Sequence, residues 1–269
     1  MSIFSSVLCA LDSSPLAPRV LRHAIGIAGA CGARLSIVTV VSQDAHQAEA
    51  KIARLLKEVL PPGATYVGQP ITLGMQLVMG QTVDAIIEAA GDKTDLIVAG
   101  THSKSGISGW FLGSTSAQLL EQAVCPVLLV PAGDVDIVAI DATSARLTPG
   151  AVLGAVDLSD INERQLTVAA ELAALASQPL TLMTVADTSA IDVAAEQALA
   201  ELARRVGASA RTLVRHGTVA AEIDRAAVAE HAGLVVMGLR AVDRGTPGAI
   251  ATAVLKQKEA LVVLAVPAR

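Results

Sequence analysis

Apolar residues occur along the chain in two patterns, one typical of strands and one typical of helices. Short apolar runs such as SVLCALD (6–12) and DLIVAG (95–100) alternate with longer segments in which apolar residues recur at helical spacing, such as LAPRVLRHAIGIAGAC (16–31). In the first half this pattern predicts strands at 6–12, 34–41, 71–80, 95–100 and 125–131, and helices at 16–31, 44–60, 82–93 and about 113–123. The alternation predicts an α/β fold in which helices cover both faces of a parallel sheet.

The first and third helices carry start signals. Ser13 and Ser14 are N-cap candidates for the first helix, and Pro15 suits its first turn. Thr82 is the cap candidate for the third helix.

The same pattern starts again in the second half. Residues 5–41 can be laid on 150–186 without a gap, so that VLCALD matches VLGAVD and SIVTVV matches TLMTVA. LIVAG later matches LVVMG, and CPVLLVP matches EALVVLAVP. A repeat near half the chain length predicts two tandem domains, at 1–133 and 148–269, each with a doubly wound five-stranded parallel sheet. Ile137–Ile140, in the linker, is a candidate extra strand.

Composition narrows the class of function. Hydrophobic residues are 52% of the chain and aromatic residues 1%, so Ala, Val, Leu and Ile must form the core. The scarcity of aromatic residues argues against base stacking on single-stranded nucleic acid. The net charge is −5 with no basic run, so neither a nucleic-acid surface nor a membrane surface is expected.

The cysteines and the apolar runs give expectations about compartment. Cys9, Cys31 and Cys125 are far apart, odd in number and without CxxC spacing, so we expect buried thiols rather than a zinc site or disulfides. The first residues lack the features of a signal peptide, and charges interrupt each long apolar run. We therefore expect a soluble, cytoplasmic protein.

The loop GTHSKSGISGWFLGSTS (100–116) carries the candidate chemistry. A helix is expected to begin near Gly113, and the amides of its first turn have no partner within the helix. With the helix dipole they favour an anion, and Gly113 has no side chain to block one. Ser114, Thr115 and Ser116 add hydroxyl groups, so the segment is typical of a phosphate-binding loop.

A topological rule places the same site independently. In doubly wound sheets, ligands bind beyond the carboxyl ends of the strands where the winding reverses. If the first strand is central, Asp12 and Gly100 flank that point, and Asp12 is expected to accept hydrogen bonds from a base or sugar. Two alternatives stay open: Asp12 is a turn residue, and His102 is an exposed loop residue rather than a phosphate or metal contact.

The loop and its surroundings resemble the universal stress protein family. Gly100-x2-Ser103-x9-Gly113-Ser114 is similar to the family's nucleotide-binding motif Gly-x2-Gly-x9-Gly-Ser/Thr. VLCALDSS, RLSIVTVV and AVCPVLLVP also resemble family segments, so the chain looks like a tandem member. The resemblance implies a stress-response protein with an adenine nucleotide α-hydrolase-like fold that binds ATP, with or without Mg²⁺.

By that resemblance, one set of residues would surround the nucleotide: Ala10, Leu11, Asp12, Val40, Ala99, Gly100, His102, Ser103, Gly113, Ser114, Thr115 and Ser116. One of them departs from the motif, since Ser103 stands where the family has glycine. If that position requires a positive φ, its Cβ costs about 1 kcal/mol or more.

The second copy keeps the spacing and loses the glycines. Its segment reads Gly238-x2-Ala241-x9-Ala251-Thr252, with Pro247 and the negative Asp243 inside the loop. Asp157 still matches Asp12. We expect this domain to have lost most of the anion pocket and to be structural or regulatory.

Partners and rival functions follow from the remaining pattern. The last apolar strands, 127–130 and 261–266, are predicted to pair about a pseudo-twofold axis, and a homodimer of chains is a further expectation. Without a Walker A sequence, a triad or paired carboxylates, we expect ATP binding with little turnover, and slow hydrolysis aided by His102 stays open. The alternative is an interaction module of the same fold that binds no nucleotide. An adenylating enzyme would need an SGGxDS-like or HIGH-like sequence, which the chain lacks.

Overall fold

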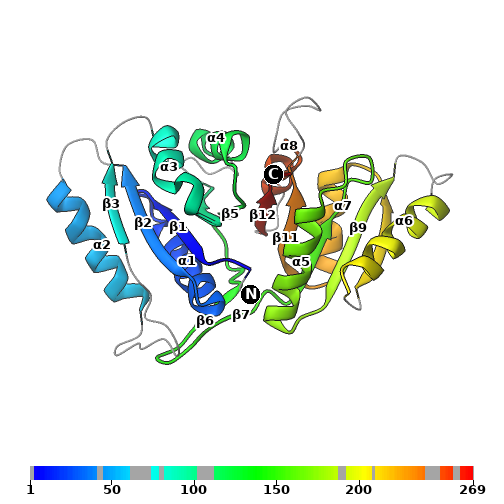
Figure 1. Cartoon of the computed structure of the whole chain (residues 1–269), viewed down its shortest axis with the longest axis horizontal. Helices are drawn as coiled ribbons and strands as arrows, with labels where there is room; N and C mark the ends of the chain where they lie inside the picture. The colour runs from blue at the N-terminus through cyan, green and yellow to red at the C-terminus, as the bar shows by residue number, and fades with distance from the viewer. Residues whose placement is uncertain are drawn as a thin grey trace. The chain divides into compact units, whose positions relative to one another are not determined.

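The computed structural model describes two compact units along the chain (Figure 1). The described residues are 3–40, 45–60, 74–78, 82–101, 112–186, 192–207, 210–239, 249–256 and 261–268. The first domain contains Met1–Ala132 and Val138–Thr148, and the second contains Gly133–Ile137 and Pro149–Arg269.

The first domain is a five-stranded parallel α/β unit, as predicted. In chain order it contains β1 (Ser6–Leu11), α1 (Ala17–Cys31), β2 (Arg34–Val40), α2 (Ala45–Val59), β3 (Gly74–Val78), α3 (Thr82–Ala90), a 3₁₀ turn (Gly91–Lys93), β4 (Leu96–Gly100), α4 (Ser114–Gln122) and β5 (Val127–Val130). The strands lie in the order β5-β4-β1-β2-β3. Since β1 pairs with both β2 and β4, the first strand is central and the winding reverses between β1 and β4.

The first helix begins later than its sequence signals indicate. Pro15 lies in a turn, and α1 starts at Ala17 with Pro18 in its first turn. Ser14 acts on that turn, because its hydroxyl accepts from the Leu16 amide at 3.3 Å. The prediction that Pro15 belongs to the helix was wrong, since Pro18 suits the first turn equally well.

The second domain repeats this arrangement. It contains β8 (Ala151–Ala155), α5 (Glu163–Ala176), β9 (Leu180–Ala186), α6 (Asp192–Arg205), β10 (Arg211–His216), α7 (Val219–Ala229), β11 (Ala232–Gly238), α8 (Ala249–Leu255) and β12 (Val262–Val266). Its strand order is β10-β9-β8-β11-β12, with parallel pairing throughout. The winding therefore reverses between β8 and β11.

The segment between the two sequence repeats forms a hairpin on the first domain. β6 (Val138–Ile140) pairs antiparallel with β7 (Ala145–Leu147), and both strands pack on α1. A Cβ on Gly26 of α1 would lie 2.5 Å from Val138 Cβ, so only glycine lets the hairpin approach this closely. The predicted extra strand is thus one half of a hairpin that covers a helix.

Aliphatic residues fill both cores. Leu8, Ile25, Leu35 and Leu128 are among the fully buried side chains of the first domain. The three cysteines are free and buried as predicted, and burial raises the pKa of the Cys9 thiol. Among the described helices, none combines the length and apolar character needed to cross a membrane.

Candidate functional site

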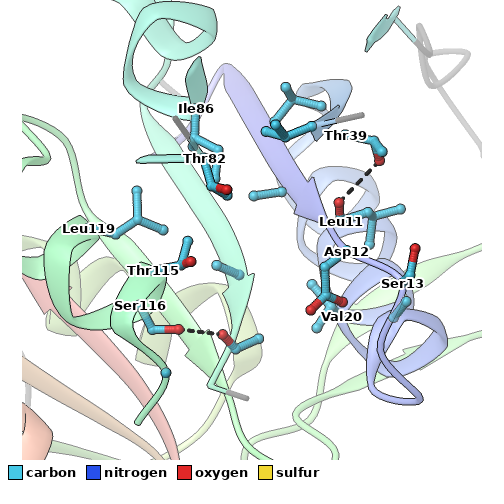
Figure 2. Close-up of a pocket in the computed structure, with 17 residues that line it drawn as sticks. Leu11, Asp12, Ser13, Val20, Thr39, Thr82, Ile86, Thr115, Ser116 and Leu119 are labelled. Carbon is cyan, nitrogen blue, oxygen red and sulfur yellow. Dashed lines mark hydrogen bonds between the residues drawn. The ribbon is translucent and has the colours of Figure 1, made fainter. Parts of the chain in front are cut away.

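A pocket of about 280 Å³ lies at the carboxyl ends of the first domain's central strands (Figure 2). Its walls come from β1 and β2 on one side and from α3 and α4 on the other. It is lined by Ala10, Leu11, Asp12, Ser13, Ala17, Val20, Val38, Thr39, Val40, Thr82, Ile86, Ala99, Gly100, Gly113, Thr115, Ser116 and Leu119. The pocket therefore occupies the point where the winding reverses, which is where this class of sheet binds ligands.

Asp12 is both a turn residue and a pocket residue. Its Oδ1 accepts from the Ser14 amide at 2.9 Å, which orients the carboxylate directly after β1. Its Oδ2 has no hydrogen-bond partner among the described residues, and the side chain is exposed. The two interpretations from sequence are compatible, because one oxygen fixes the turn while the same residue lines the pocket.

The α4 side of the pocket presents a helix start without a side-chain cap. Gly113 is the N-cap, in extended conformation, and its amide donates to the Thr101 carbonyl at 2.7 Å. The Ser116 hydroxyl donates to the Gly100 carbonyl at 2.7 Å, which ties the first turn of α4 to the end of β4. The amides that follow Gly113 are the ones that a helix of this kind leaves for an outside acceptor.

The rest of the pocket is mainly apolar. Val20, Val38, Ile86 and Leu119 supply aliphatic surface, and the Thr39 hydroxyl is turned to the Leu11 carbonyl at 3.1 Å (Figure 2). An apolar wall beside a helix start and a carboxylate suits a ligand that has a flat apolar part and an anionic part.

Most of the residues expected from sequence come together in this pocket. Those that line it are Ala10, Leu11, Asp12, Val40, Ala99, Gly100, Gly113, Thr115 and Ser116. Ser114 begins α4 but is not among the lining residues. His102 and Ser103 lie outside the described residues.

Sequence reasoning missed the helix residues that complete the pocket. Ala17 and Val20 of α1, Thr82 and Ile86 of α3, and Leu119 of α4 line it. Their apolar members follow helical spacing like any core position. Only the knowledge that these helices meet at one end of the sheet could have identified them.

The second domain keeps part of the same polar arrangement. Asp157 Oδ1 accepts from the Ser159 amide at 3.0 Å, as Asp12 does from Ser14. The Thr184 hydroxyl donates to the Val156 carbonyl at 2.9 Å, in parallel with Thr39. The loop residues Ala241, Asp243 and Pro247 lie outside the described residues. Ala251 and Thr252, aligned with Gly113 and Ser114, lie inside α8 rather than at its start.

Comparison with known proteins points to one family. The profile of the Universal stress protein family matches residues 4–131. A universal stress protein of Thermus aquaticus is 35% identical over 137 residues, which are 48% of this chain and 99% of that protein. Another, of Methanocaldococcus jannaschii, is 28% identical over 141 residues, which are 48% of this chain and 83% of that protein.

A solved structure extends the likeness to the whole chain. The structure of a universal stress protein from Archaeoglobus fulgidus superposes with a TM-score of 0.70 and 19% sequence identity. The match includes 98% of this chain and 98% of that protein. At this identity the likeness shows the fold alone, and it includes the tandem arrangement.

Proposed function

Because this chain is a tandem member of the universal stress protein family, we propose that its first domain binds ATP in the crevice between β1 and β4 as part of a stress response. The single observation that carries the proposal is the position of Asp12 and Gly113, which line the same pocket from opposite walls. The two residues are far apart in sequence, and separate physical reasons apply to them: the start of a helix at Gly113, and the reversal point of the sheet at Asp12.

ATP matches the chemistry of the pocket in three respects. The first-turn amides of α4 suit phosphate oxygens, since Gly113 supplies no side chain to cap them. Asp12 Oδ2 suits a ribose hydroxyl, which donates to a carboxylate. The aliphatic wall that includes Val38, Ile86 and Leu119 suits the faces of a purine.

The pocket also sets a limit on the chemistry. Asp12 is the only carboxylate among its described lining residues, so these residues supply no pair for general acid and base work. We therefore propose ATP as a bound ligand with little turnover. Hydrolysis aided by His102 stays open, because His102 lies outside the described residues.

Calorimetry and native mass spectrometry on the full chain test the proposal. Titrations with ATP, ADP and GTP, each with and without Mg²⁺, should give saturable binding of the adenine nucleotides and weaker binding of GTP. A difference between the two ATP titrations would show that Mg²⁺ accompanies the nucleotide. Absence of both ATP and ADP binding at millimolar nucleotide would overturn the proposal in favour of an interaction module. Measuring Ser103→Gly beside the wild type would show what the departure from the family motif costs.

Asp12→Asn and Asp157→Asn form a matched pair for the ribose contact. Asparagine keeps an oxygen for the turn amide and removes the charge. If Asp12 accepts from the ribose, Asp12→Asn should lower ATP affinity about tenfold, because hydrogen bonds to a charged group are worth roughly 1.5–3 kcal/mol. Asp157→Asn makes the same change in the second domain and should leave the affinity unaltered. If the two variants bound ATP with equal affinity, the Asp12 carboxylate would not contact the ribose.

A further inference from the structure

The second domain has two buried polar side chains where the first domain has its pocket. Asn162 and Gln165, at the start of α5, are 7% and 2% exposed. Both lie beside the carboxyl ends of β8 and β11, which is the reversal point of that sheet.

Gln165 connects the ends of the two strands that flank the reversal point. Its Nε2 donates to the Ala155 carbonyl of β8 at 2.7 Å and to the Val236 carbonyl of β11 at 3.0 Å. Both protons of the amide nitrogen are thereby used. The side chain spans the reversal point and satisfies backbone oxygens on each side of it.

Asn162 is hydrogen-bonded to its surroundings as well. Its Nδ2 donates to the Val266 carbonyl at 2.9 Å, and its Oδ1 accepts from the backbone amide of Gln165 at 3.0 Å. As the N-cap of α5 it also anchors the helix from which Gln165 projects. A buried group with this many hydrogen bonds is costly to displace, since an incoming ligand would have to replace each of them.

The pair fills space as well as bonding. A Cβ placed on Gly238 would lie 2.9 Å from Gln165 Oε1 and 3.1 Å from Asn162 Cβ. The two side chains therefore contact the end of β11, just as Leu16 and Val20 contact the matched Gly100 at the end of β4, so the domains differ here in polarity and hydrogen bonding.

The gapless alignment of the two copies gives the residues that the first domain has instead. Ala17 matches Asn162 and Val20 matches Gln165, and both Ala17 and Val20 line the pocket of the first domain. Val20 is labelled in Figure 2. The equivalent strand-end residues, Ala10 and Gly100, line it too. At these two helix positions the first domain has small apolar side chains and an open pocket, and the second has polar side chains bonded to the strands.

We infer that the side chains of Asn162 and Gln165 occupy the crevice of the second domain. We infer further that they prevent a nucleotide from binding there, so that the chain binds one nucleotide, in the first domain. The pair lies on α5, outside the altered loop at 241–248. The statement that each chain holds one nucleotide rests on the proposed function. The statement that the two side chains occupy the crevice does not.

The occupancy is tested without nucleotide. In the amide spectrum of the intact ¹⁵N-labelled protein, the side-chain NH₂ protons of Gln165 and Asn162 should exchange with solvent at least ~100-fold more slowly than those of an exposed glutamine such as Gln118. Assignment follows from Gln165→Glu and Asn162→Asp, in which one NH₂ pair disappears. Exchange as fast as that of Gln118 would overturn the inference.

The control over binding is tested by exchanging the pair between domains. Ala17→Asn with Val20→Gln installs the second domain's pair in the first domain, and ATP affinity should fall by ~100-fold or more because the added side chains compete for the pocket. Far-ultraviolet circular dichroism and thermal unfolding establish that the variant is folded. Calorimetry of the wild type should give one nucleotide per chain.

Each outcome separates this inference from the proposed function. If the wild type binds no adenine nucleotide, the proposed function fails and the exchange rates alone decide the occupancy. If the wild type binds two nucleotides per chain, or if the folded double variant binds as the wild type does, the inference fails and the proposed function stands. If the double variant does not fold, the wild-type stoichiometry and the exchange rates still decide it.

Discussion

The crevices at the reversal points of the two sheets have similar strands. They differ in the side chains that the helix after the first strand contributes, α1 in one domain and α5 in the other. Each has a carboxylate that fixes the turn after its first strand, Asp12 in one and Asp157 in the other. In the first domain α1 contributes Ala17 and Val20 and leaves a pocket. In the second, α5 contributes Asn162 and Gln165 and ties the strand ends together. A fold can thus keep its topology while two helix positions determine whether the reversal point is open.

The largest effect should come from adding a charge at the start of α4. In Gly113→Asp the new carboxylate would cap the first-turn amides and repel phosphate, so ATP affinity should fall ~100-fold or more. The free energy of unfolding should stay level or rise by roughly 0.3 kcal/mol, because aspartate is a slightly better N-cap than glycine. Calorimetry and urea unfolding measure the two quantities separately.

Gln118→Asp is the control for this variant, since it adds the same charge at an exposed position of the same helix. Its ATP affinity should stay within about threefold of the wild type. Unchanged affinity in Gly113→Asp would mean that the α4 amides do not hold the phosphates, and the difference between the two crevices would lose its chemical basis.

A second contrast lies on the outer faces of the matched helices. Gly26→Ala would drive a Cβ against Val138, and overpacking of this kind costs about 1–3 kcal/mol, partly offset by the roughly 1 kcal/mol that alanine gains in a helix. The net loss of stability should therefore be at most about 2 kcal/mol. Glu171, the aligned residue of α5, is exposed, and Glu171→Ala should change stability by less than about 0.5 kcal/mol. If urea unfolding gave a larger loss of stability for Glu171→Ala than for Gly26→Ala, the hairpin would have to move away from α1 at little cost.

A smaller effect is expected at the bond between α4 and β4. Ser116 is 3% exposed and donates to the Gly100 carbonyl at 2.7 Å, whereas the aligned residue in the second domain is Val254. Ser116→Ala should lower the free energy of unfolding by about 1 kcal/mol, since it leaves a strand-end carbonyl without its partner. Thr167→Ala removes an exposed hydroxyl that bonds the Glu163 carbonyl at 3.1 Å, and it should be nearly neutral. Equal losses in thermal unfolding would contradict this account.

The smallest effect concerns pH and the hairpin. Hydrogen bonds from the Ser144 hydroxyl and from the Thr143 and Ser144 amides lower the pKa of Asp141 well below the ordinary value. Since the folded pKa is depressed, the resulting stabilisation is present above the unfolded-state pKa of about 4 and is lost as pH falls through the folded value. A ¹³C titration of the Asp141 carboxyl should show this low midpoint, and Asp141→Asn should loosen the hairpin amides near neutral pH. A midpoint near 4 would contradict the hydrogen-bonded turn.

The sequence predicted the fold well because strand and helix periodicity are local properties. It also brought Asp12, Gly100 and Gly113 to one place, because the topological rule depends only on which strand is central. It could not identify Val20 or Leu119, since an apolar residue at helical spacing has the same pattern whether it faces a core or a pocket. Gln165 was missed because its partners on β8 and β11 are 10 and 71 residues away.

The linker has a consequence for how the protein is made. Gly133–Ile137 belongs to the second domain, yet the hairpin that follows it belongs to the first. As the chain leaves the ribosome, the first domain therefore lacks the cover of α1 until residue 148 has emerged. A gene truncated after residue 132 would encode a first domain that never receives that cover, whereas residues 1–148 include all of it. No single cut gives both domains complete, because residues 133–137 and 138–148 belong to different domains.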